Sequence, residues 1–257
     1  MKKILLLLFV FASTYTIAQK QQYHVALIGF YNCENFYDTV NNTLINDEEF
    51  LPNSERHYNS AIYLDKVSRL SDVISQMGTD INPDGISMLG VSEIENDTVL
   101  NDLIHSEKLR DRHLKFVQYN SPDIRGIDVA LIYNPKYFQV LFSAPLFVKL
   151  PGGSKEAYFT RDVLYVQGIM DGDTVNVFVN HWPSRSGGEE RSIPARAAAA
   201  GVVKLRVDSL TAINPMAKIV IMGDLNDDPI SPSVAKVLNA KGKEKDVKPG
   251  GLFNPWI

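Results

Sequence analysis

The sequence predicts an α/β fold in which two mixed β-sheets pack face to face and helices cover their outer sides. Two segments of the chain indicate this arrangement, because apolar strand-like runs and helical patterns follow one another in a similar order in both. Most of the runs are continuously apolar, as in strands that are covered on both faces. With 257 residues and 45% hydrophobic content, the chain can bury such a core, and a single domain over residues 23–257 is expected.

The first expected strand runs from Tyr23 to Tyr31. A polar, asparagine-rich loop is expected from Asp38 to Ser60, and long loops of this kind are often functional. Apolar residues then recur at helical spacing from Val67 to Met77, and Gly78 supplies a helix stop. Further strands are expected at 114–119, 129–133, 138–142, 163–166 and 175–179.

The last third of the chain combines helices with one more strand. Pro194 is expected to open an alanine-rich helix that runs toward Leu210, because proline favours the first helical position. A strand over 218–222 and a short helix over 233–238 follow. The lysine- and glycine-rich segment 240–251 is expected to be an exposed loop.

Residues 1–18 have the features of a secretory signal peptide. Lysines at positions 2 and 3 precede an apolar stretch from Ile4 to Ala12, and Thr16-Ile17-Ala18 places small residues where a signal peptidase cuts. The apolar part is too short for a stable membrane-spanning helix. A buried first helix or strand is the alternative. We expect cleavage after Ala18 and export to a periplasm or out of the cell.

The charge balance argues against a protein that coats nucleic acid nonspecifically. The chain has 26 Lys and Arg against 30 Asp and Glu, and loss of the two lysines in residues 1–18 would leave 24 minus 30, or about −6. Nonspecific coating depends on many basic contacts to phosphates. Cys33 is the only cysteine, so no intramolecular disulfide can form. We expect Cys33 to be a small residue at a strand end. The protein is expected to be a monomer.

Four polar clusters each follow directly after an apolar run. Residues at one end of neighbouring strands gather along one rim of a sheet, where open α/β folds bind ligands. Carboxylate and amide oxygens are hard ligands suited to Mg²⁺ or Mn²⁺, and Mg²⁺ typically uses one or two protein carboxylates and leaves room for substrate phosphate. The combination predicts phosphoester hydrolysis. The clusters are Asn32-Cys33-Glu34-Asn35, Glu93-Ile94-Glu95-Asn96, Asn180-His181-Trp182 and Gly223-Asp224-Leu225-Asn226.

Longer versions of these clusters, with one further segment, occur in a characteristic order. They are Phe30-Tyr31-Asn32-Cys33-Glu34-Asn35, Ser92-Glu93-Ile94-Glu95-Asn96, Arg125-Gly126-Ile127-Asp128-Val129-Ala130-Leu131, Asn180-His181-Trp182-Pro183 and Gly223-Asp224-Leu225-Asn226-Asp227. In this order they resemble the motifs of the endonuclease/exonuclease/phosphatase superfamily, and it is the ordered set that is specific. The resemblance spans Tyr23 to the last residue. It implies the four-layered, deoxyribonuclease-I-like α/β sandwich.

The resemblance also implies roles for the strand-end residues. Glu93 matches the metal-binding glutamate of the family, and Asn32 matches an asparagine that contacts the metal site or the phosphate. Asp224 and Asn226 match the pair that orients the attacking water and holds phosphate or metal. His181 matches a histidine beside the scissile phosphate. The residues alone leave structural alternatives: a salt bridge for the glutamate, turns for the asparagines and the aspartate, and a buried structural histidine.

Three further residues are expected near the substrate phosphate. Arg125 and Arg161 resemble family positions that contact phosphate, although salt-bridged scaffolding is the alternative for each. Asn180 is expected to position His181 there.

The end of the chain departs from the family pattern. That pattern closes with an Asp-His pair after one more strand, and its histidine deprotonates the attacking water. The histidines of this chain are His24, His57, His105, His113 and His181, so none follows the Gly-Asp-Leu-Asn cluster. We therefore expect the chain to be incomplete at its C-terminus, with the last strands of the sandwich missing.

Two functional hypotheses follow. The first is an exported phosphodiesterase that depends on Mg²⁺ or Mn²⁺, with nucleic acid as the preferred substrate. A phosphatase or a lipid phosphodiesterase is the alternative within this class, because fold and metal do not choose the leaving group. The second hypothesis is a noncatalytic, phosphate-binding fragment.

Overall fold

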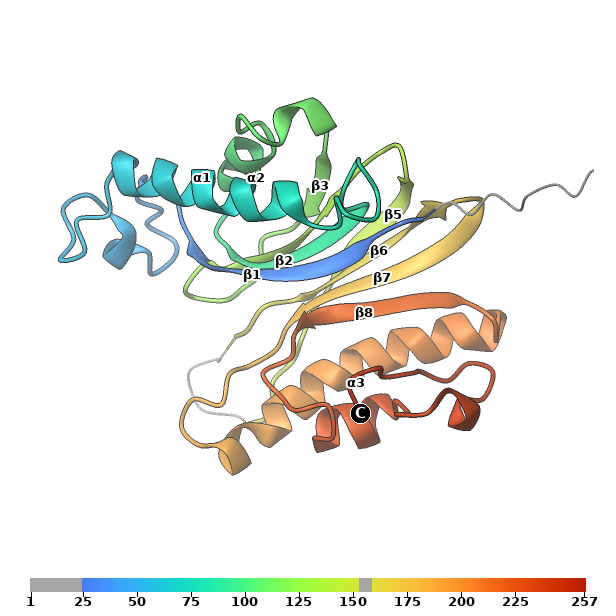
Figure 1. The fold of residues 1–257 in the computed structure, drawn as a ribbon. Coiled ribbons are helices and arrows are strands. Elements are labelled where there is room, and N and C mark those ends of the chain that lie inside the picture. The colour runs from blue at the N-terminus through green and yellow to red at the C-terminus, as the bar shows by residue number, and fades with distance from the viewer. Residues whose placement is uncertain (1–24, 153–158) are drawn as a thin grey trace, which may run out of the picture.

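The computed structural model describes residues 25–152 and 159–257, so the expected signal peptide lies outside the described part. The chain forms two four-stranded sheets that pack face to face (Figure 1). The first sheet contains, in spatial order, β1 (Ile28–Phe36), β2 (Met88–Ile94), β4 (Asp128–Tyr133) and β3 (Lys115–Gln118). β1 and β2 are parallel, and the other neighbours are antiparallel.

The second sheet has the same mixed character. It contains, in spatial order, β5 (Phe138–Leu146), β6 (Val163–Met170), β7 (Asp173–His181) and β8 (Lys218–Asp224). Its one parallel pair is β7 with β8. β1 and β8 are edge strands of their sheets and lie against each other across the sandwich. Two packed mixed sheets confirm the predicted fold class.

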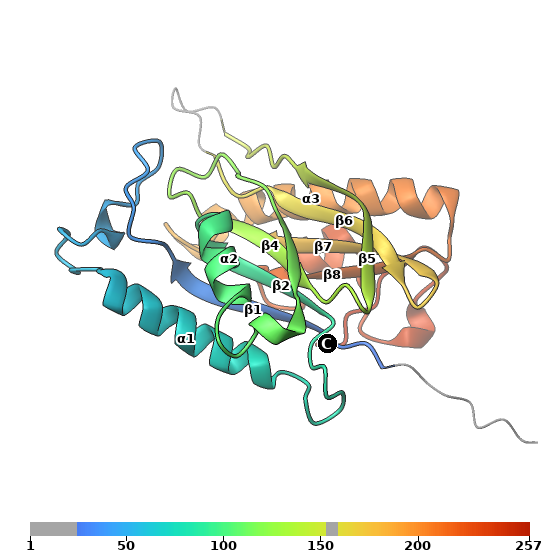
Figure 2. The same cartoon turned by 90° about the horizontal axis from the view of Figure 1, so that it is seen from above.

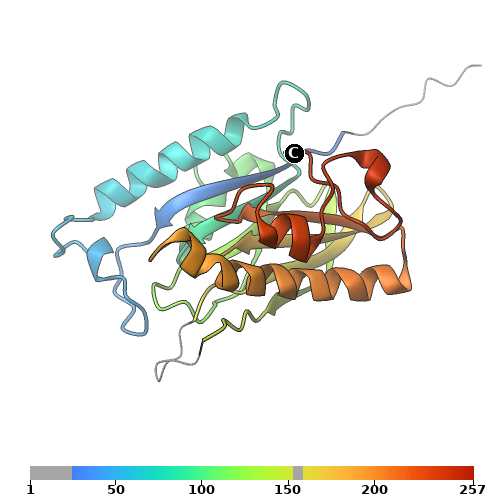
Figure 3. The ribbon, with the colours of Figure 1, turned by 90° about the horizontal axis from the view of Figure 1, so that it is seen from below.

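Helices cover both outer faces. α1 (Ser60–Gln76) and α2 (Asp97–Ile104) lie over the first sheet, which Figure 2 shows from above. α3 (Glu189–Ile213) and the short π-helix η3 (Ser233–Leu238) cover the second sheet, which Figure 3 shows from below. Single-turn 3-10 helices lie in the connections: η1 (Glu48–Phe50), η2 (Arg110–Arg112) and η4 (Glu244–Asp246). None of the helices in residues 25–152 and 159–257 is both long and apolar enough to cross a bilayer.

Side chains of β4 alternate between two hydrophobic layers. Val129 and Leu131 join the layer between the sheets, whereas Ala130 and Ile132 pack under the helices of the first sheet. Close approach of the sheets depends on Gly90 in β2. A Cβ atom at this position would lie 2.8 Å from the sulfur of Met222 and 3.1 Å from Cγ1 of Val179, both in the opposite sheet. A larger side chain at position 90 would push the sheets apart.

The helices on the first sheet begin at asparagine caps. The side chain of Asn59 accepts hydrogen bonds from the backbone N–H groups of Ala61 and Ile62, at 3.0 and 3.2 Å. Asn96 caps α2 by accepting from the N–H of Val99 at 3.1 Å. The sequence analysis missed α2, although an asparagine cap followed by an amphipathic pattern is a recognisable helix signal. The cap also ties α2 to the polar cluster at the end of β2.

Strand boundaries differ from those predicted from the sequence. β1 begins at Ile28 and continues to Phe36, whereas the sequence predicts a strand from Tyr23 to Tyr31. Parallel pairing with β2 continues through Asn32 and resumes at Phe36 after an irregularity. β5 and β6 also extend beyond the predicted runs, because their antiparallel pairing continues. β7 extends to His181, because its end pairs in parallel with β8.

The prediction that Pro194 opens a helix is wrong. α3 begins at Glu189, and the proline lies inside it. Proline has no N–H, so one i to i−4 hydrogen bond is lost there. The first turn is held instead by Ser192, whose hydroxyl donates to the carbonyls of Gly188 and Glu189 at 2.9 and 2.8 Å. The hydroxyl also accepts a hydrogen bond from buried Arg196 at 2.7 Å.

Asp128, at the start of β4, should make stability depend on pH. Its carboxylate is buried and accepts hydrogen bonds from the backbone N–H of Ser121 and from Nε2 of Gln118. Burial raises its pKa from 3.8 to about 7, although these hydrogen bonds oppose the rise. The protonated form is therefore favoured in the folded state. Its contribution to stability is fully present below pH about 4 and is lost as the pH rises through about 7.

We expect the Asp128→Asn variant to gain stability relative to the wild type as the pH rises from about 4 to 8. The upper limit of the gain is about 1.4 kcal/mol for each unit of pKa shift. Urea unfolding of both proteins at several pH values in this range measures the difference. Equal differences in unfolding free energy at all pH values would contradict the assignment.

Candidate functional site

The polar clusters at the ends of the two parallel strand pairs, β1 with β2 and β7 with β8, meet at one edge of the sandwich. The C-terminal ends of β1 and β2 lie beside each other, and so do those of β7 and β8 (Figure 1). His181 pairs with Asp224 there. A hydrogen bond between Asn32 and Asp224 then joins the two sheets at this edge. The structure therefore brings together Asn32, Glu93, His181 and Asp224 from four separate strand ends.

The amide of Asn32 lies between two carboxylates. Its Nδ2 is 3.2 Å from Oε1 of Glu93 and 3.2 Å from Oδ2 of Asp224. Its Oδ1 accepts a hydrogen bond of 2.8 Å from the backbone N–H of Glu34, which fixes the orientation of the amide. The N–H groups of Asn32 thus place a partial positive charge between the two carboxylates.

Glu93 is held by the turn at the end of β1. Its Oε2 accepts a hydrogen bond of 2.9 Å from the backbone N–H of Asn35. Glu34, Asn35 and Glu93 all have left-handed backbone conformations, with φ of 54°, 57° and 58°. Such conformations are uncommon for residues other than glycine and often occur at functional sites. Lys66 of α1 stabilises the turn, since its ammonium donates to the carbonyls of Glu34 and Asn35.

Asp224 and Asn226 form a turn at the end of β8. The backbone N–H of Asn226 donates to Oδ1 of Asp224 at 3.0 Å, which is the Asx turn that the sequence left as an alternative. Oδ2 of Asp224 remains directed at Asn32. The side-chain amide of Asn226 donates to the carbonyl of Trp182 at 2.9 Å. The turn therefore orients the aspartate within the site and also binds it to the end of β7.

His181 is a buried, neutral side chain. Burial, with the nearby charges of Arg161 and Arg125, lowers its pKa to about 2. Its Nε2 lies 3.8 Å from Oε1 of Glu93, which is too long for a hydrogen bond, and a neutral imidazole forms no ion pair. Its Nδ1 is buried and has no hydrogen-bond partner in the described residues. The ring therefore has hydrogen-bonding capacity that the described residues do not use.

The side chain of Asn180 faces the protein interior and not the polar site. It is fully buried, and its Nδ2 donates to the carbonyls of Phe178 and Met222 at 3.2 and 3.0 Å. Its Oδ1 accepts a hydrogen bond of 3.0 Å from the indole of Trp182. The side chain thus fixes the tryptophan next to His181.

The two arginines differ in their surroundings. The guanidinium of Arg161 is buried, pairs with Asp123 at 2.9 Å, and donates to the carbonyls of His181 and Trp182. Arg125 has a side chain that is 48% exposed, with Nε 3.7 Å from the same aspartate. Only Arg125 therefore has a guanidinium that solvent can reach.

Lys66 and Asp123 contribute to the site but were not predicted from the sequence. The lysine lies on a helix, where a solvent-exposed role is the usual interpretation, yet burial lowers its pKa beside the Glu34 turn. The aspartate lies in the loop before β4 and carries no strand-end signal. Both act through contacts that are distant in sequence, so a local pattern could not identify them.

The residues at this edge fit a divalent cation. The described part of the chain has no group of three or more His, Cys, Asp or Glu residues placed to hold a metal ion. Mg²⁺ does not need such a group, because it is usually bound through one or two carboxylates and substrate oxygens. Glu93 and Asp224 supply carboxylates, and only the neutral amide of Asn32 lies between them. Like-charged groups that converge in this way favour a bound cation.

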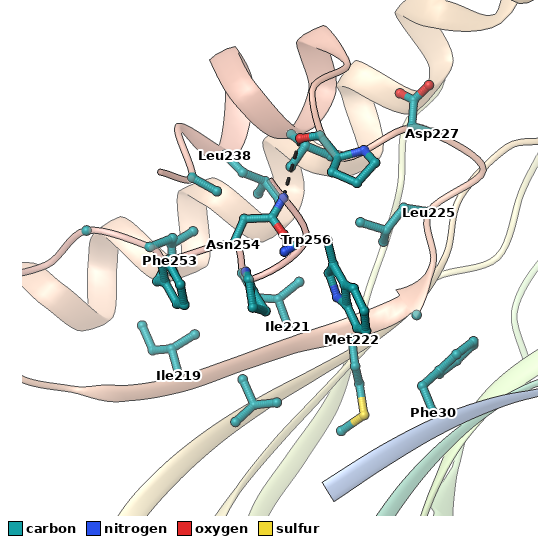
Figure 4. A pocket seen from close by; sticks show the side chains of 18 of the residues that line it. Phe30, Ile219, Ile221, Met222, Leu225, Asp227, Leu238, Phe253, Asn254 and Trp256 are labelled. Carbon is teal, nitrogen blue, oxygen red and sulfur yellow. Dashed lines mark hydrogen bonds between the residues drawn. The ribbon is translucent and has the colours of Figure 1, made fainter. Parts of the chain in front are cut away.

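A pocket of about 1360 Å³ adjoins the site along β8. Asp224 and Asn226 line its polar end, whereas Asn32, Glu93 and His181 do not line it. Its remaining lining is mostly apolar, as Figure 4 shows for Phe30, Ile219, Ile221, Met222, Phe253 and Trp256. Asn254 helps to hold the C-terminal segment over the pocket through a hydrogen bond to the carbonyl of Pro229 at 3.4 Å.

Solved structures share this fold at low sequence identity. A mannosyl-6-phosphatase of Bacteroides thetaiotaomicron VPI-5482 matches with a TM-score of 0.55 and 15% identity, over 84% of this chain and 70% of that chain. An endonuclease/exonuclease/phosphatase family protein of Bacteroides thetaiotaomicron matches with a TM-score of 0.51 and 17% identity, over 70% and 61% of the two chains. No curated protein sequence matches the chain.

Two further solved structures match over a smaller share of their own length. Truncated TDP2 of Caenorhabditis elegans has a TM-score of 0.45 and 23% identity, and the match covers 63% of this chain and 56% of that chain. For a second structure of TDP2 from the same organism, the match covers 45% of that chain. The matched part of this chain therefore covers roughly half the length of both TDP2 chains.

The family assignment comes from the sequence over nearly its whole described length. The family model of the endonuclease/exonuclease/phosphatase family matches residues 27–257. The matched range includes all four strand ends that form the polar site. Members of this family are phosphoester hydrolases. The chain therefore belongs to the endonuclease/exonuclease/phosphatase family.

Proposed function

We propose that the protein is an exported phosphodiesterase that depends on Mg²⁺ or Mn²⁺, with nucleic acid as its preferred substrate. One observation carries the proposal: two carboxylates from different sheets converge on a single neutral amide, beside a buried neutral histidine. This combination provides a place for a cation and an uncharged donor for a phosphoryl oxygen. Membership of a phosphoester hydrolase family supports it.

Glu93 is the proposed ligand of the ion, and Asn32 contacts the ion or the phosphate. A bound Mg²⁺ or Mn²⁺ would polarise the phosphoryl group and stabilise the charge of the leaving oxygen. Asp224 and Asn226 are rigidly placed by their turn and would orient the attacking water. His181, in its neutral form, would donate a hydrogen bond to a phosphoryl oxygen, where charge develops during the reaction.

Arg125 is the proposed contact to substrate phosphate at the rim of the site, because its guanidinium is half exposed. The preference for nucleic acid is the least constrained part of the proposal. The family includes nucleases and phosphatases, and the scaffold does not select the leaving group. A monoesterase is the second candidate, since one fold relative is a mannosyl-6-phosphatase.

Assays with matched substrates separate these possibilities. We expect Mg²⁺-dependent hydrolysis of plasmid DNA and of bis(p-nitrophenyl) phosphate, with much slower hydrolysis of p-nitrophenyl phosphate or of a sugar phosphate. The opposite preference would identify a monoesterase. Binding of inorganic phosphate without hydrolysis of any of these substrates would favour a noncatalytic, phosphate-binding domain.

The Glu93→Gln variant should lose affinity for the ion and with it the hydrolytic activity. Glutamine keeps the size of the side chain but removes the charge that holds the cation. Isothermal titration with Mg²⁺ measures the loss, and a thermal melt confirms that the variant folds. Glu34→Gln is the matched control, because the Glu34 side chain lies on the exposed surface of the adjoining turn. Equal Mg²⁺ affinity in Glu93→Gln and wild type would remove Glu93 from the metal site.

The His181→Ala variant should lower kcat far more than it changes Mg²⁺ affinity. Loss of one preorganised donor to a developing charge typically lowers kcat by about 10²- to 10³-fold, or about 3 to 4 kcal/mol. Asp224→Asn should also lower kcat strongly, because the amide is a poor orienting group for water. Steady-state kinetics with saturating Mg²⁺ measure both effects. A near-normal kcat in either variant would show that these strand ends are not the active site.

A further inference from the structure

All three nitrogens of the Arg161 guanidinium donate hydrogen bonds within the protein. The side chain is 6% exposed. Its Nε donates to the carbonyl of His181 at 3.1 Å, one terminal nitrogen donates to the carbonyl of Trp182 at 2.7 Å, and the other donates to Asp123 at 2.9 Å. Because each nitrogen already donates a hydrogen bond inside the protein, the guanidinium has little capacity left for a substrate phosphate.

The two carbonyl contacts fix the chain where β7 leaves the sheet. The Trp182 carbonyl, which Arg161 binds, also accepts the side-chain amide of Asn226. The Trp182 N–H donates to the carbonyl of Asp224 at 2.9 Å. One peptide segment therefore carries the histidine of the site and is bonded directly to both members of the Asp224 turn. Arg161 and Asn226 thus hold this segment through the same carbonyl oxygen.

Asp123 keeps the buried guanidinium in place. Its Oδ2 pairs with Arg161, and its Oδ1 accepts the backbone N–H of Arg125 at 2.9 Å. Asp123 is 6% exposed. Burying either the carboxylate of Asp123 or the guanidinium of Arg161 without the other would therefore be costly. The same aspartate thus anchors the buried arginine and the loop that presents the exposed one.

We infer that Arg161 and Asp123 are positioning residues that fix His181 and the Asp224 turn, and that of the two arginines only Arg125 contacts the substrate phosphate. This inference rests on the proposed function of the site. It assigns different kinetic roles to two arginines that the family resemblance treats alike. Loss of the positioning pair should impair the chemical step, and loss of Arg125 should impair substrate binding.

The kinetic test compares Arg161→Lys, Asp123→Asn, Arg125→Ala and a control, Arg69→Lys. Lysine keeps the charge of Arg161 but cannot bind two carbonyls and a carboxylate in one plane. We expect kcat to fall about a hundredfold in Arg161→Lys, with KM within about twofold, because a displacement of about 1 Å can cost this much. Arg125→Ala should raise KM about tenfold or more with kcat nearly unchanged. Arg69, in an exposed ion pair with Asp65, should affect neither.

A spectroscopic readout tests the positioning pair without activity. The chain has two tryptophans, Trp182 and Trp256, so two indole N–H signals are expected in a nitrogen-15 correlation spectrum. The Trp182 signal should shift in Arg161→Lys and in Asp123→Asn, because its peptide is released from the guanidinium. It should stay in place in Arg125→Ala and Arg69→Lys. The exposed Trp256 provides an internal reference.

The two readouts distinguish failure of the inference from failure of the proposed function. If the wild type hydrolyses no phosphoester, the proposed function fails, and the indole signals still decide whether the pair positions the segment. An unchanged Trp182 signal in both Arg161→Lys and Asp123→Asn would overturn the inference. A raised KM with unchanged kcat in Arg161→Lys would overturn it as well, since that result indicates a phosphate contact. If Arg161→Lys does not fold, Asp123→Asn supplies both readouts.

Discussion

Two carboxylates from different sheets share one amide, and the rest of the site is organised around this contact. Glu93 belongs to β2 and Asp224 to β8, yet both lie 3.2 Å from Nδ2 of Asn32. The contact exists only because the two sheets pack closely, which Gly90 permits by leaving room for Met222. Two carboxylates that contact the same nitrogen atom repel each other, and the neutral amide compensates this repulsion only in part. Sheet packing therefore brings together two negative charges whose repulsion a bound cation would relieve.

The backbone at this edge is held in conformations that need support. Glu34, Asn35, Glu93 and Asn226 all have positive φ, and a non-glycine residue in a sparsely populated region can cost about 1 to 3 kcal/mol, with asparagine among the more tolerant types. The surrounding contacts offset this cost. Lys66 binds two carbonyls of the first turn, and the side chain of Asp224 accepts the N–H of Asn226. These contacts also fix the side chains before any ligand arrives, so the strain and the preorganisation have the same origin.

The sequence predicts the layers and the polar edge because both depend on local patterns. Apolar runs identify the strands, and the clusters after them identify the strand ends that meet. It does not predict how each side chain is used. Asn180 and Trp182 belong to one cluster, but their side chains bind each other and the backbone of β7 and β8. Lys66 and Asp123 act through partners that only folding brings near. Similarly, the start of α3 depends on hydrogen bonds of Ser192 and not on the proline that the pattern emphasises.

The charged groups around His181 include both signs. Nε2 of the ring lies 3.8 Å from Oε1 of Glu93, and the charges of Arg161 and Arg125 are near enough to lower the pKa of the ring. The chain as a whole is acidic, with a net charge of −4, so attraction of a phosphodiester cannot come from its overall charge. In the proposed function, it would come from this local arrangement and from a cation bound at the carboxylates. Because burial and the two arginines hold the histidine pKa near 2, the ring stays neutral across physiological pH. In the proposed function, the histidine can therefore serve as an uncharged donor to a phosphoryl oxygen without changing the net charge of the site.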